Sequence, residues 1–427
     1  MDILPQQIYI PTELLGLNDV KVIDVKINLE NEIIIKVQST KSEIPCHICG
    51  GKTNPYGNGM PLKLQHLPIL GKKTFIEITP QRGICPTCDK NTTTTQTLSW
   101  HERNGHQTKP YQQYLLLSLV NSTIADVSRK ENVSESTLQR IIDKNINTEI
   151  DWKNFKTLGI IGIDEISLKK GYRDFVSIIT SKNDNQINIL AVIKGRDKAE
   201  IKAFLLKIPR RKAKTIVAIC CDMYDGYVNA AKEVLGESVP IVVDRFHISK
   251  LYRKSLISLR KKELARLNKD LSSEEYQSLK SAIAILVKKQ EFFTREEKIE
   301  LEKIFKYSPA IKAAYRLTRQ LTAIFNKKQR KESAVIKINE WTEKVKTSDV
   351  KCFDGFIKTL EKYKNEITNY FINRNTSGFV EGFNNKIKVL KRRCYGIFNI
   401  KNIFQRLFLD LRGYKLFNLN QRVACVF

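Results

Sequence analysis

With 427 residues, the chain is long enough for about three domains of ordinary size and a buried core. Lys and Arg number 73 against 45 acidic residues, and the formal charge of +28 excludes the balance of an ordinary cytosolic enzyme and indicates a polyanionic partner. The basic residues are spread along the chain, which excludes a cationic tail and favours nucleic acid over a membrane. No apolar run reaches bilayer-spanning length and residues 1–10 do not resemble a signal peptide, so we expect a cytoplasmic protein.

Two Cys-x-x-Cys pairs mark the first segment, which we predict to be a zinc-binding domain over residues 1–108. The pairs are Cys46 with Cys49 and Cys85 with Cys88. Each pair places two thiolates on one tight turn, and four thiolates complete the tetrahedral shell of a structural zinc ion. The residues between the pairs alternate like strands, so a hairpin is predicted to bring the two turns together.

Other roles for these and the remaining cysteines stay open. The four thiols of the pairs could instead be reduced core residues, and nearby histidines could replace a ligand, although we expect a surface or packing role for each histidine. These histidines are His47, His66, His101 and His106. We expect the other five cysteines to be buried, reduced and structural. They are Cys220, Cys221, Cys352, Cys394 and Cys425.

The next segment, residues 109–154, is predicted to be a helix-turn-helix DNA-binding domain. In "STIADVSRKENVSESTLQRIIDKNI", residues 122–146, helical periodicity breaks at "ENVSES" and then resumes. Asn132 suits a left-handed turn position, Val133 can fill the space between the helices, and Ser134 is a good N-cap. Ser136, Gln139 and Arg140 would then face outward, toward a DNA major groove. A plain packing motif is the alternative.

The third segment alternates strands and helices, and its strands end in acidic residues. We predict three strands in a meander followed by two helix-linked strands, which form a mixed sheet covered by helices over residues 155–261. Asp164 lies in the first of these strands, Asp222 ends the fourth and Asp244 ends the fifth. Residues 262–370 are predicted to be an all-helical insertion domain, and residues 371–427 to return to the core as C-terminal helices.

Asp164 and Asp222 are acids in apolar strands, and an unpaired buried charge is costly. If the first and fourth strands are neighbours, the two carboxylates meet at one edge and require a cation. Oxygen ligands indicate Mg²⁺ or Mn²⁺, and a pair of such ions supports attack on a phosphodiester. Glu381 supplies a third acid from a helix, unless it only supports a solvated amphipathic helix.

A basic run follows Glu381 on the same predicted helix. Asn385, Lys388 and Arg392 share a face with Glu381 through spacings of 4, 7 and 11 residues. The acid is therefore expected to hold metal while the basic run contacts the DNA backbone. The expected DNA contacts in this run are Lys386, Lys388, Lys391, Arg392 and Arg393.

Four strings together resemble a known family. "GIDEIS", "CDMYDGY", "VVDRFHISKLYRKSL" and "SGFVEGFNNKIKVLKRRCYG" look like the ISL-three family of bacterial insertion-sequence transposases, of the DDE class with an RNase H-like catalytic core. The resemblance covers nearly the whole chain, with the family's order of modules. It implies that Asp164, Asp222 and Glu381 are the catalytic triad. Asp244 and His247 match the family's "DRFH" signature and are candidate accessory residues, with a structural role as the alternative for His247.

The resemblance also implies a reaction and its partners. Two Mg²⁺ or Mn²⁺ ions held by the triad would activate water to nick double-stranded DNA at the transposon ends, and the freed 3'-hydroxyl would attack target DNA. Both ends must be held at once, so a homodimer or higher oligomer is expected. Two alternatives remain: a zinc and helix-turn-helix DNA-binding regulator with an inactive nuclease-like domain, and a metal-dependent repair nuclease.

Overall fold

The computed structural model describes residues 9–88, 92–167, 175–184, 186–288, 290–376, 378–394, 396–397 and 399–418. Within these ranges, the side chains of Ser281, Ala282 and Glu381 are not among those described. The chain divides into two compact units, Met1–Asn147 with Gln405–Phe427, and Thr148–Phe404. Within the described ranges, no helix is long and apolar enough to cross a membrane.

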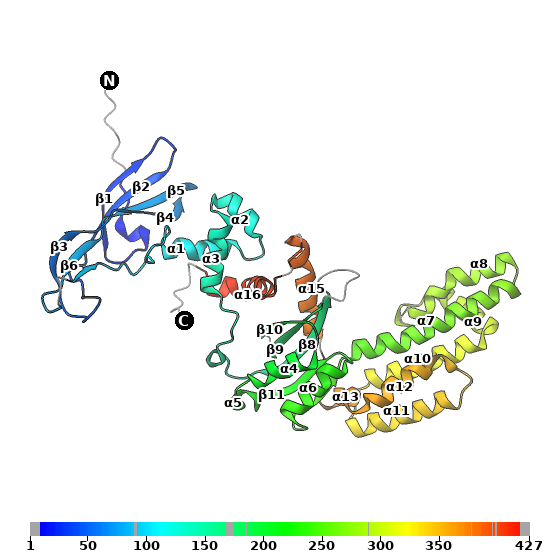
Figure 1. Ribbon diagram of the computed structural model, residues 1–427. Helices are drawn as coiled ribbons and strands as arrows, with labels where there is room; N and C mark the ends of the chain where they lie inside the picture. The colour runs from blue at the N-terminus through cyan, green and yellow to red at the C-terminus, as the bar shows by residue number, and fades with distance from the viewer. Residues whose placement is uncertain are drawn as a thin grey trace. The chain divides into compact units, whose positions relative to one another are not determined.

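The first unit begins with two small sheets (Figure 1). In the larger sheet β2 and β5 pair in parallel at its centre, while β1 and β4 flank them as antiparallel strands. Apolar side chains such as Ile35 and Ile76 point into its core because they alternate with polar residues along each strand. The strands are β1 (Val20–Ile27), β2 (Ile33–Ser39), β4 (Leu62–Ile69) and β5 (Lys72–Ile78), and in the smaller sheet β3 (Asn54–Asn58), β6 (Gln81–Ile84) and β7 (Thr93–Thr95).

Three helices follow, and they confirm the predicted helix-turn-helix. Asn132 ends α2 in the left-handed conformation, with φ 51° and ψ 49°. Ser134 caps α3 by accepting a hydrogen bond from the Thr137 N–H, and Val133 is buried. The helices are α1 (Lys109–Ser118), α2 (Ile124–Glu131) and α3 (Glu135–Asn145).

The end of α16 (Ile400–Leu416) belongs to this same unit and packs on the three helices. The Gln405 amide donates hydrogen bonds to the Asp143 carboxylate at 2.9 Å and to the Ile146 carbonyl at 3.1 Å. The Asp410 carboxylate accepts from the backbone N–H of Asn121 at 2.8 Å, and Leu409 is fully buried in the helical core. The sequence did not predict this return of the C-terminal helix.

The second unit is built on a five-stranded mixed sheet of order β10-β9-β8-β11-β12. The first three strands form the predicted antiparallel meander, and β11 and β12 are parallel to β8. The predicted neighbours, the first and fourth strands, therefore pair. The strands are β8 (Gly159–Ser167), β9 (Phe175–Asn183), β10 (Gln186–Lys194), β11 (Ile216–Cys221) and β12 (Ile241–Val243).

Helices cover both faces of this sheet. On one face, Tyr227 of α6 shares a hydrogen bond with Ser177 of β9 at 2.8 Å, and α4 packs beside α6. On the other face, α15 crosses β8 so closely that a Cβ atom at Gly162 would lie 2.3 Å from Val380. The side chain of Val380 thus occupies the space that any larger residue at position 162 would need. The helices are α4 (Lys198–Leu206), α6 (Asp225–Leu235) and α15 (Gly378–Arg393).

A helical region separates β12 from α15. It begins with α7, which starts at Arg245 and runs through the boundary predicted at residues 261 and 262, so the helical character starts earlier than expected. Trp341 packs edge to face on Phe353 and Phe356 in the core of this region. The main helices are α7 (Arg245–Asp270), α8 (Ser273–Ala282), α9 (Arg295–Tyr307), α10 (Pro309–Asn326), α11 (Lys331–Lys346), α12 (Asp354–Lys362) and α13 (Lys364–Thr368).

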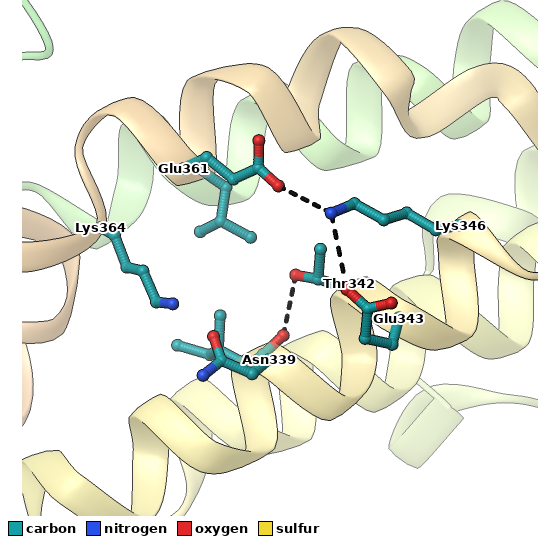
Figure 2. A pocket seen from close by; sticks show the side chains of 8 residues that line it. Asn339, Thr342, Glu343, Lys346, Glu361 and Lys364 are labelled. Carbon is teal, nitrogen blue, oxygen red and sulfur yellow. Dashed lines mark hydrogen bonds and ion pairs between the residues drawn. The ribbon is translucent and has the colours of Figure 1, made fainter.

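A pocket of about 350 Å³ lies between α11 and the pair α12 and α13 (Figure 2). Lys346 reaches across it, with its Nζ 3.0 Å from the Glu361 carboxylate and 3.5 Å from the Glu343 carboxylate. These groups are exposed, so the ion pairs add little to stability. The charged residues of the pocket are two glutamates and two lysines, so their charges balance.

The buried imidazole of His66 generates a pH prediction. Its ring nitrogens contact the Thr108 hydroxyl at 2.8 Å and the Leu15 carbonyl at 3.1 Å, and burial lowers its pKa from 6.5 to about 4. This confirms a packing role for His66. Because the folded-state pKa lies below that of the unfolded chain, its contribution to stability is complete above pH 6.5 and is lost as the pH falls toward 4.

We expect the first unit to lose about 3 kcal/mol of stability from this group between pH 7 and pH 4. Hydrogen exchange of the β4 and β5 amides, followed by mass spectrometry, measures the local unfolding free energy. The His66→Gln variant should show a correspondingly shallower pH dependence, and His101→Gln should behave like the wild type. Equal pH dependence in wild type and His66→Gln would contradict the assignment.

Candidate active site and four-cysteine cluster

The register of β8 and β11 brings two aspartates to one edge of the sheet. Ile163 pairs with Cys221 in parallel, so the next residues, Asp164 and Asp222, stand side by side. Cys221 also pairs with Val243, which places Asp244 beyond Asp222 at the same edge. Three acids therefore align across three adjacent strands, as the sequence predicted for the first two.

The Asp164 carboxylate lies in a partly dehydrated position. Burial raises its pKa, and the nearby charge of Asp222 acts in the same direction. The backbone N–H of Glu165 donates a hydrogen bond to it at 2.7 Å, and the Asn384 side-chain amide donates another, which together oppose the rise. Two donors thus hold Asp164 in place, and among the residues that the structure describes no Lys or Arg forms an ion pair with it, although the nearby His247 also favours its charged form and so lowers its pKa.

Two groups contact the Asp222 carboxylate. Its Oδ1 accepts a hydrogen bond from the Met223 N–H at 2.6 Å and lies 3.1 Å from His247 Nδ1. His247 stands in the first turn of α7, and both side chains are about 30% exposed. The histidine therefore contacts an acid of the candidate site directly, and its accessory role stays a prediction.

Asp244 has a different environment. It is only 4% exposed, and its carboxylate accepts a hydrogen bond from the Phe246 N–H at 2.9 Å, which caps α7. A helix cap accounts for an acid at this position without any catalytic role. Glu165, adjacent to Asp164, pairs with Ser177 on the opposite face of the sheet and forms a 3.3 Å ion pair with Arg196.

Asn384 is the residue that sequence reasoning missed. It is 8% exposed, its amide donates to Asp164, and its Oδ1 has no hydrogen-bond partner among the described residues. An unsatisfied oxygen on a residue that contacts Asp164 adds to an oxygen-rich donor set of the kind that Mg²⁺ and Mn²⁺ prefer. The neighbouring Asn385, which the predicted helix face included, is exposed.

Glu381 lies in α15, but its side chain is outside the described part of the chain. Its backbone position precedes Asn384 by three residues, and residues with this spacing are neighbours on a helix. Val380 contacts the Gly162 position of β8 and Asn384 contacts Asp164, so the helix follows β8 past the aspartates.

The basic run of α15 is only partly exposed. Lys388 and Arg392 are exposed, whereas Lys391 is half-buried and its Nζ donates to the Ser167 carbonyl at 2.9 Å. Lys386 and Arg393 are half-buried and each has a further interaction. Among the predicted DNA contacts of this run, Lys388 and Arg392 are therefore the most exposed to solvent.

The four-cysteine cluster forms in the first unit. The sulfur atoms of Cys46, Cys49, Cys85 and Cys88 all lie within 4.8 Å of one another. The Cys46–Cys88 and Cys49–Cys85 sulfur pairs are 3.8 and 3.6 Å apart, and a tetrahedral site with Zn–S bonds of about 2.3 Å requires about 3.8 Å. This geometry is compatible with zinc.

Local backbone features shape the cluster. The backbone N–H groups of Ile48 and Gly51 point at the Cys46 and Cys49 sulfurs, 3.5 and 3.4 Å away. Gly50 makes the turn possible because its φ of +71° lies in the left-handed region. The predicted hairpin, β4 with β5, lies between the two cysteine pairs in the chain and is confirmed.

The remaining histidines and cysteines fall outside this cluster. His47 contacts the Thr94 hydroxyl at 3.0 Å, and His101 contacts the Gly105 carbonyl at 2.9 Å. Cys220 and Cys221 are buried as predicted, but Cys352 and Cys394 are only half-buried. Cys425 lies outside the described residues.

On α3, the residues predicted to face a DNA major groove differ in their exposure. Ser136 and Arg140 are exposed, whereas Gln139 is half-buried and its amide donates to Asp143 at 2.9 Å and to Gln405 at 3.3 Å. The inner residues Leu138 and Ile142 are fully buried, as predicted. The outward face of α3 is thus partly occupied by α16.

Comparison with known proteins agrees with this arrangement. A family profile described as "Helix-turn-helix domain of transposase family ISL3" matches residues 96–144, and one described as "Transposase" matches residues 161–407, more than half of the chain. A helix-turn-helix domain followed by a transposase domain identifies the chain as a DNA-binding transposase. The chain belongs to the ISL-three family of DDE transposases, the family that its motifs resemble.

Curated relatives span nearly the same length. "Transposase for insertion sequence element IS1001" of Bordetella parapertussis is 23% identical over 363 residues, which cover 85% of this chain and 87% of that protein. "Transposase for insertion sequence element IS1557" from two strains of Mycobacterium tuberculosis is 22% identical over 391 residues, 87% of this chain and 86% of those proteins.

Proposed function

We propose that this protein is the transposase of a bacterial insertion sequence, which binds the element's terminal inverted repeats, cuts the DNA and joins its ends to a target. The observation that carries the proposal is the paired placement of Asp164 and Asp222 at one sheet edge, with Asn384 of α15 against Asp164. The family's DDE class and the mixed sheet support an RNase H-like core.

Asp164, Asp222 and Glu381 would hold two Mg²⁺ or Mn²⁺ ions, which supply charge that activates water and stabilises the leaving oxygen of a phosphodiester. The protein's own contribution is orientation. Glu165 N–H and Asn384 fix the Asp164 carboxylate, and His247 contacts the Asp222 carboxylate. Such positioning groups set the precision of a metal site.

Two other parts of the chain would hold the DNA. Ser136 and Arg140, with Gln139 beside them, are the proposed contacts of α3 to the major groove, and Lys388 and Arg392 lead the proposed backbone contacts of α15. The four-cysteine cluster would bind a structural zinc ion. Cleavage at both ends requires two active sites, so we propose a homodimer or larger assembly.

The first test removes one acid. Asp164→Asn and Asp222→Asn should each lower DNA cleavage by about 100- to 1,000-fold or more, because a group that stabilises the transition state is lost. Gel assays with Mg²⁺ and the element's own end as substrate measure cleavage, and band shifts should show unchanged DNA binding.

The rival functions give different results in the same assays. A DNA-binding regulator would cut no DNA, so the wild type and Asp164→Asn would behave alike. A repair nuclease would cut the end but never join a 3'-hydroxyl to target DNA. If the wild-type protein neither cuts the end nor joins it to target DNA, the proposal is wrong.

Asn384 provides a second test with a matched neighbour. Asn384→Ala should lower cleavage by about 10- to 100-fold, the usual effect of losing a group that orients a metal ligand. It should also raise the Mg²⁺ concentration needed for half-maximal activity, which a purely structural defect would not do. The exposed Asn385→Ala is the control, and equal effects of the two substitutions would contradict a role for Asn384.

The third test concerns the zinc ion. We expect one zinc per chain by elemental analysis of purified protein, and Cys49→Ser should lose it and lower the melting temperature, because metal binding contributes folding free energy. Cys352→Ser is the control, since that half-buried thiol lies in the helical region. Zinc retained in Cys49→Ser, or absent from the wild type, would refute a four-thiolate site.

A further inference from the structure

One face of α7 carries an unusual concentration of positive charge. Its first 18 residues, 245–262, contain seven basic residues and no acid, and acids appear only from Glu263 onward. The apolar residues Ile248, Tyr252 and Leu256 are buried against the unit. The charge therefore gathers on the side of the helix that faces solvent.

The exposed residues form one continuous stripe. Relative to Phe246, the basic residues follow at spacings of 4, 7, 8 and 15, which keep them within about 100° of one another on an α-helix. All of them are exposed, and Phe246 is itself 51% exposed. We call these residues the α7 stripe; they are Phe246, Lys250, Arg253, Lys254 and Lys261.

The cations of the stripe are not neutralised within the described part of the chain, where none of the four has an ion-pair partner. The end of the same helix differs, because Arg266 pairs with Glu263 and Asp270 at 2.9 Å each. Four uncompensated cations in a row repel one another, so the stripe is suited to an anion that runs along it.

The stripe begins at the candidate active site. Asp244 caps α7, and His247, in the first turn, lies 3.1 Å from Asp222. Figure 1 shows α7 running out from the end of the sheet along the helical region. From Phe246 to Lys261 the stripe extends about 22 Å at 1.5 Å per residue, which matches about six base pairs of DNA.

We propose that the α7 stripe binds the phosphate backbone of the transposon end next to the phosphodiester being cut. The inference rests on the proposed function, because the cleaved strand must reach Asp164 and Asp222. The end duplex is the occupant we assign, since it must enter the site for the first cut. Phe246, exposed at the catalytic end of the stripe, offers an apolar contact to the nucleotide there.

The test is the salt dependence of DNA affinity. Each phosphate contact contributes about 0.9 to the slope of log affinity against log salt concentration, so the triple variant Lys250→Gln, Arg253→Gln, Lys254→Gln should lower the slope by about 2.7. The probe is a duplex with the terminal repeat and its flanking sequence, titrated by fluorescence anisotropy at several salt concentrations.

A matched variant removes the same charge elsewhere. Lys298→Gln, Lys306→Gln, Lys344→Gln also neutralises three exposed lysines of the helical region, on α9 and α11, and should leave the slope nearly unchanged. Equal slopes in the two triple variants, or no change in either, would overturn the inference. A loss seen only in strand transfer to target DNA would show that the stripe holds the target instead, and would also overturn it.

The outcome is separable from that of the proposed function. If Asp164→Asn abolishes cleavage while the α7 triple variant binds the end duplex with the wild-type slope, the transposase assignment stands and the stripe proposal fails. If the wild type never cuts DNA but the triple variant loses the slope, the stripe binds DNA and the proposed chemistry fails.

Discussion

The parallel pairing of β8 with β11 is the constraint on which the candidate site depends. Hydrogen bonds between these strands fix Asp164 beside Asp222, although the two residues are 58 positions apart in the chain. Neither carboxylate has a Lys or Arg partner among the described residues, and burial disfavours the charge of Asp164. Backbone geometry thus forces two acids together, and a divalent cation is the species that relieves their repulsion.

The close packing of α15 on β8 is a second constraint, and it depends on Gly162, which has no side chain. Gly162 leaves room for Val380, which lets the helix lie directly against β8 and brings Asn384 to Asp164. Even a methyl group at position 162 would lie 2.3 Å from the Val380 side chain, so that side chain or the helix that carries it would have to shift. A glycine in a central strand is usually unfavourable, so its presence here reflects a close packing requirement.

Much of this arrangement could be predicted from local signals. Asn favours the left-handed turn position and Ser favours the N-cap position, so Asn132 and Ser134 allowed the turn of the helix-turn-helix to be predicted. The alternation of apolar and polar residues predicted the hairpin of β4 and β5. The meander and its parallel additions followed from the order of strands and helices. Each of these features depends on residues that are close in sequence.

The remaining features depend on partners that a sequence does not reveal. Helical periodicity grouped Glu381 with Asn385, but the contact to β8 selects Asn384, one residue away. Asp244 looked like the end of a strand, yet its side chain caps α7, and a cap and a strand end have similar sequences. The burial of Gln139 could not be foreseen because it requires Gln405, 266 residues later.

The contact of α16 with α1, α2 and α3 has a consequence for biosynthesis. Leu409 fills the apolar centre of the helix-turn-helix, and Asp410 satisfies the backbone at Asn121. A ribosome releases N-terminal segments first, and such segments ordinarily fold as they emerge. Here α1, α2 and α3 lack part of their apolar core until α16 has been translated, so a polypeptide that ends before α16 would carry an incompletely packed helix-turn-helix.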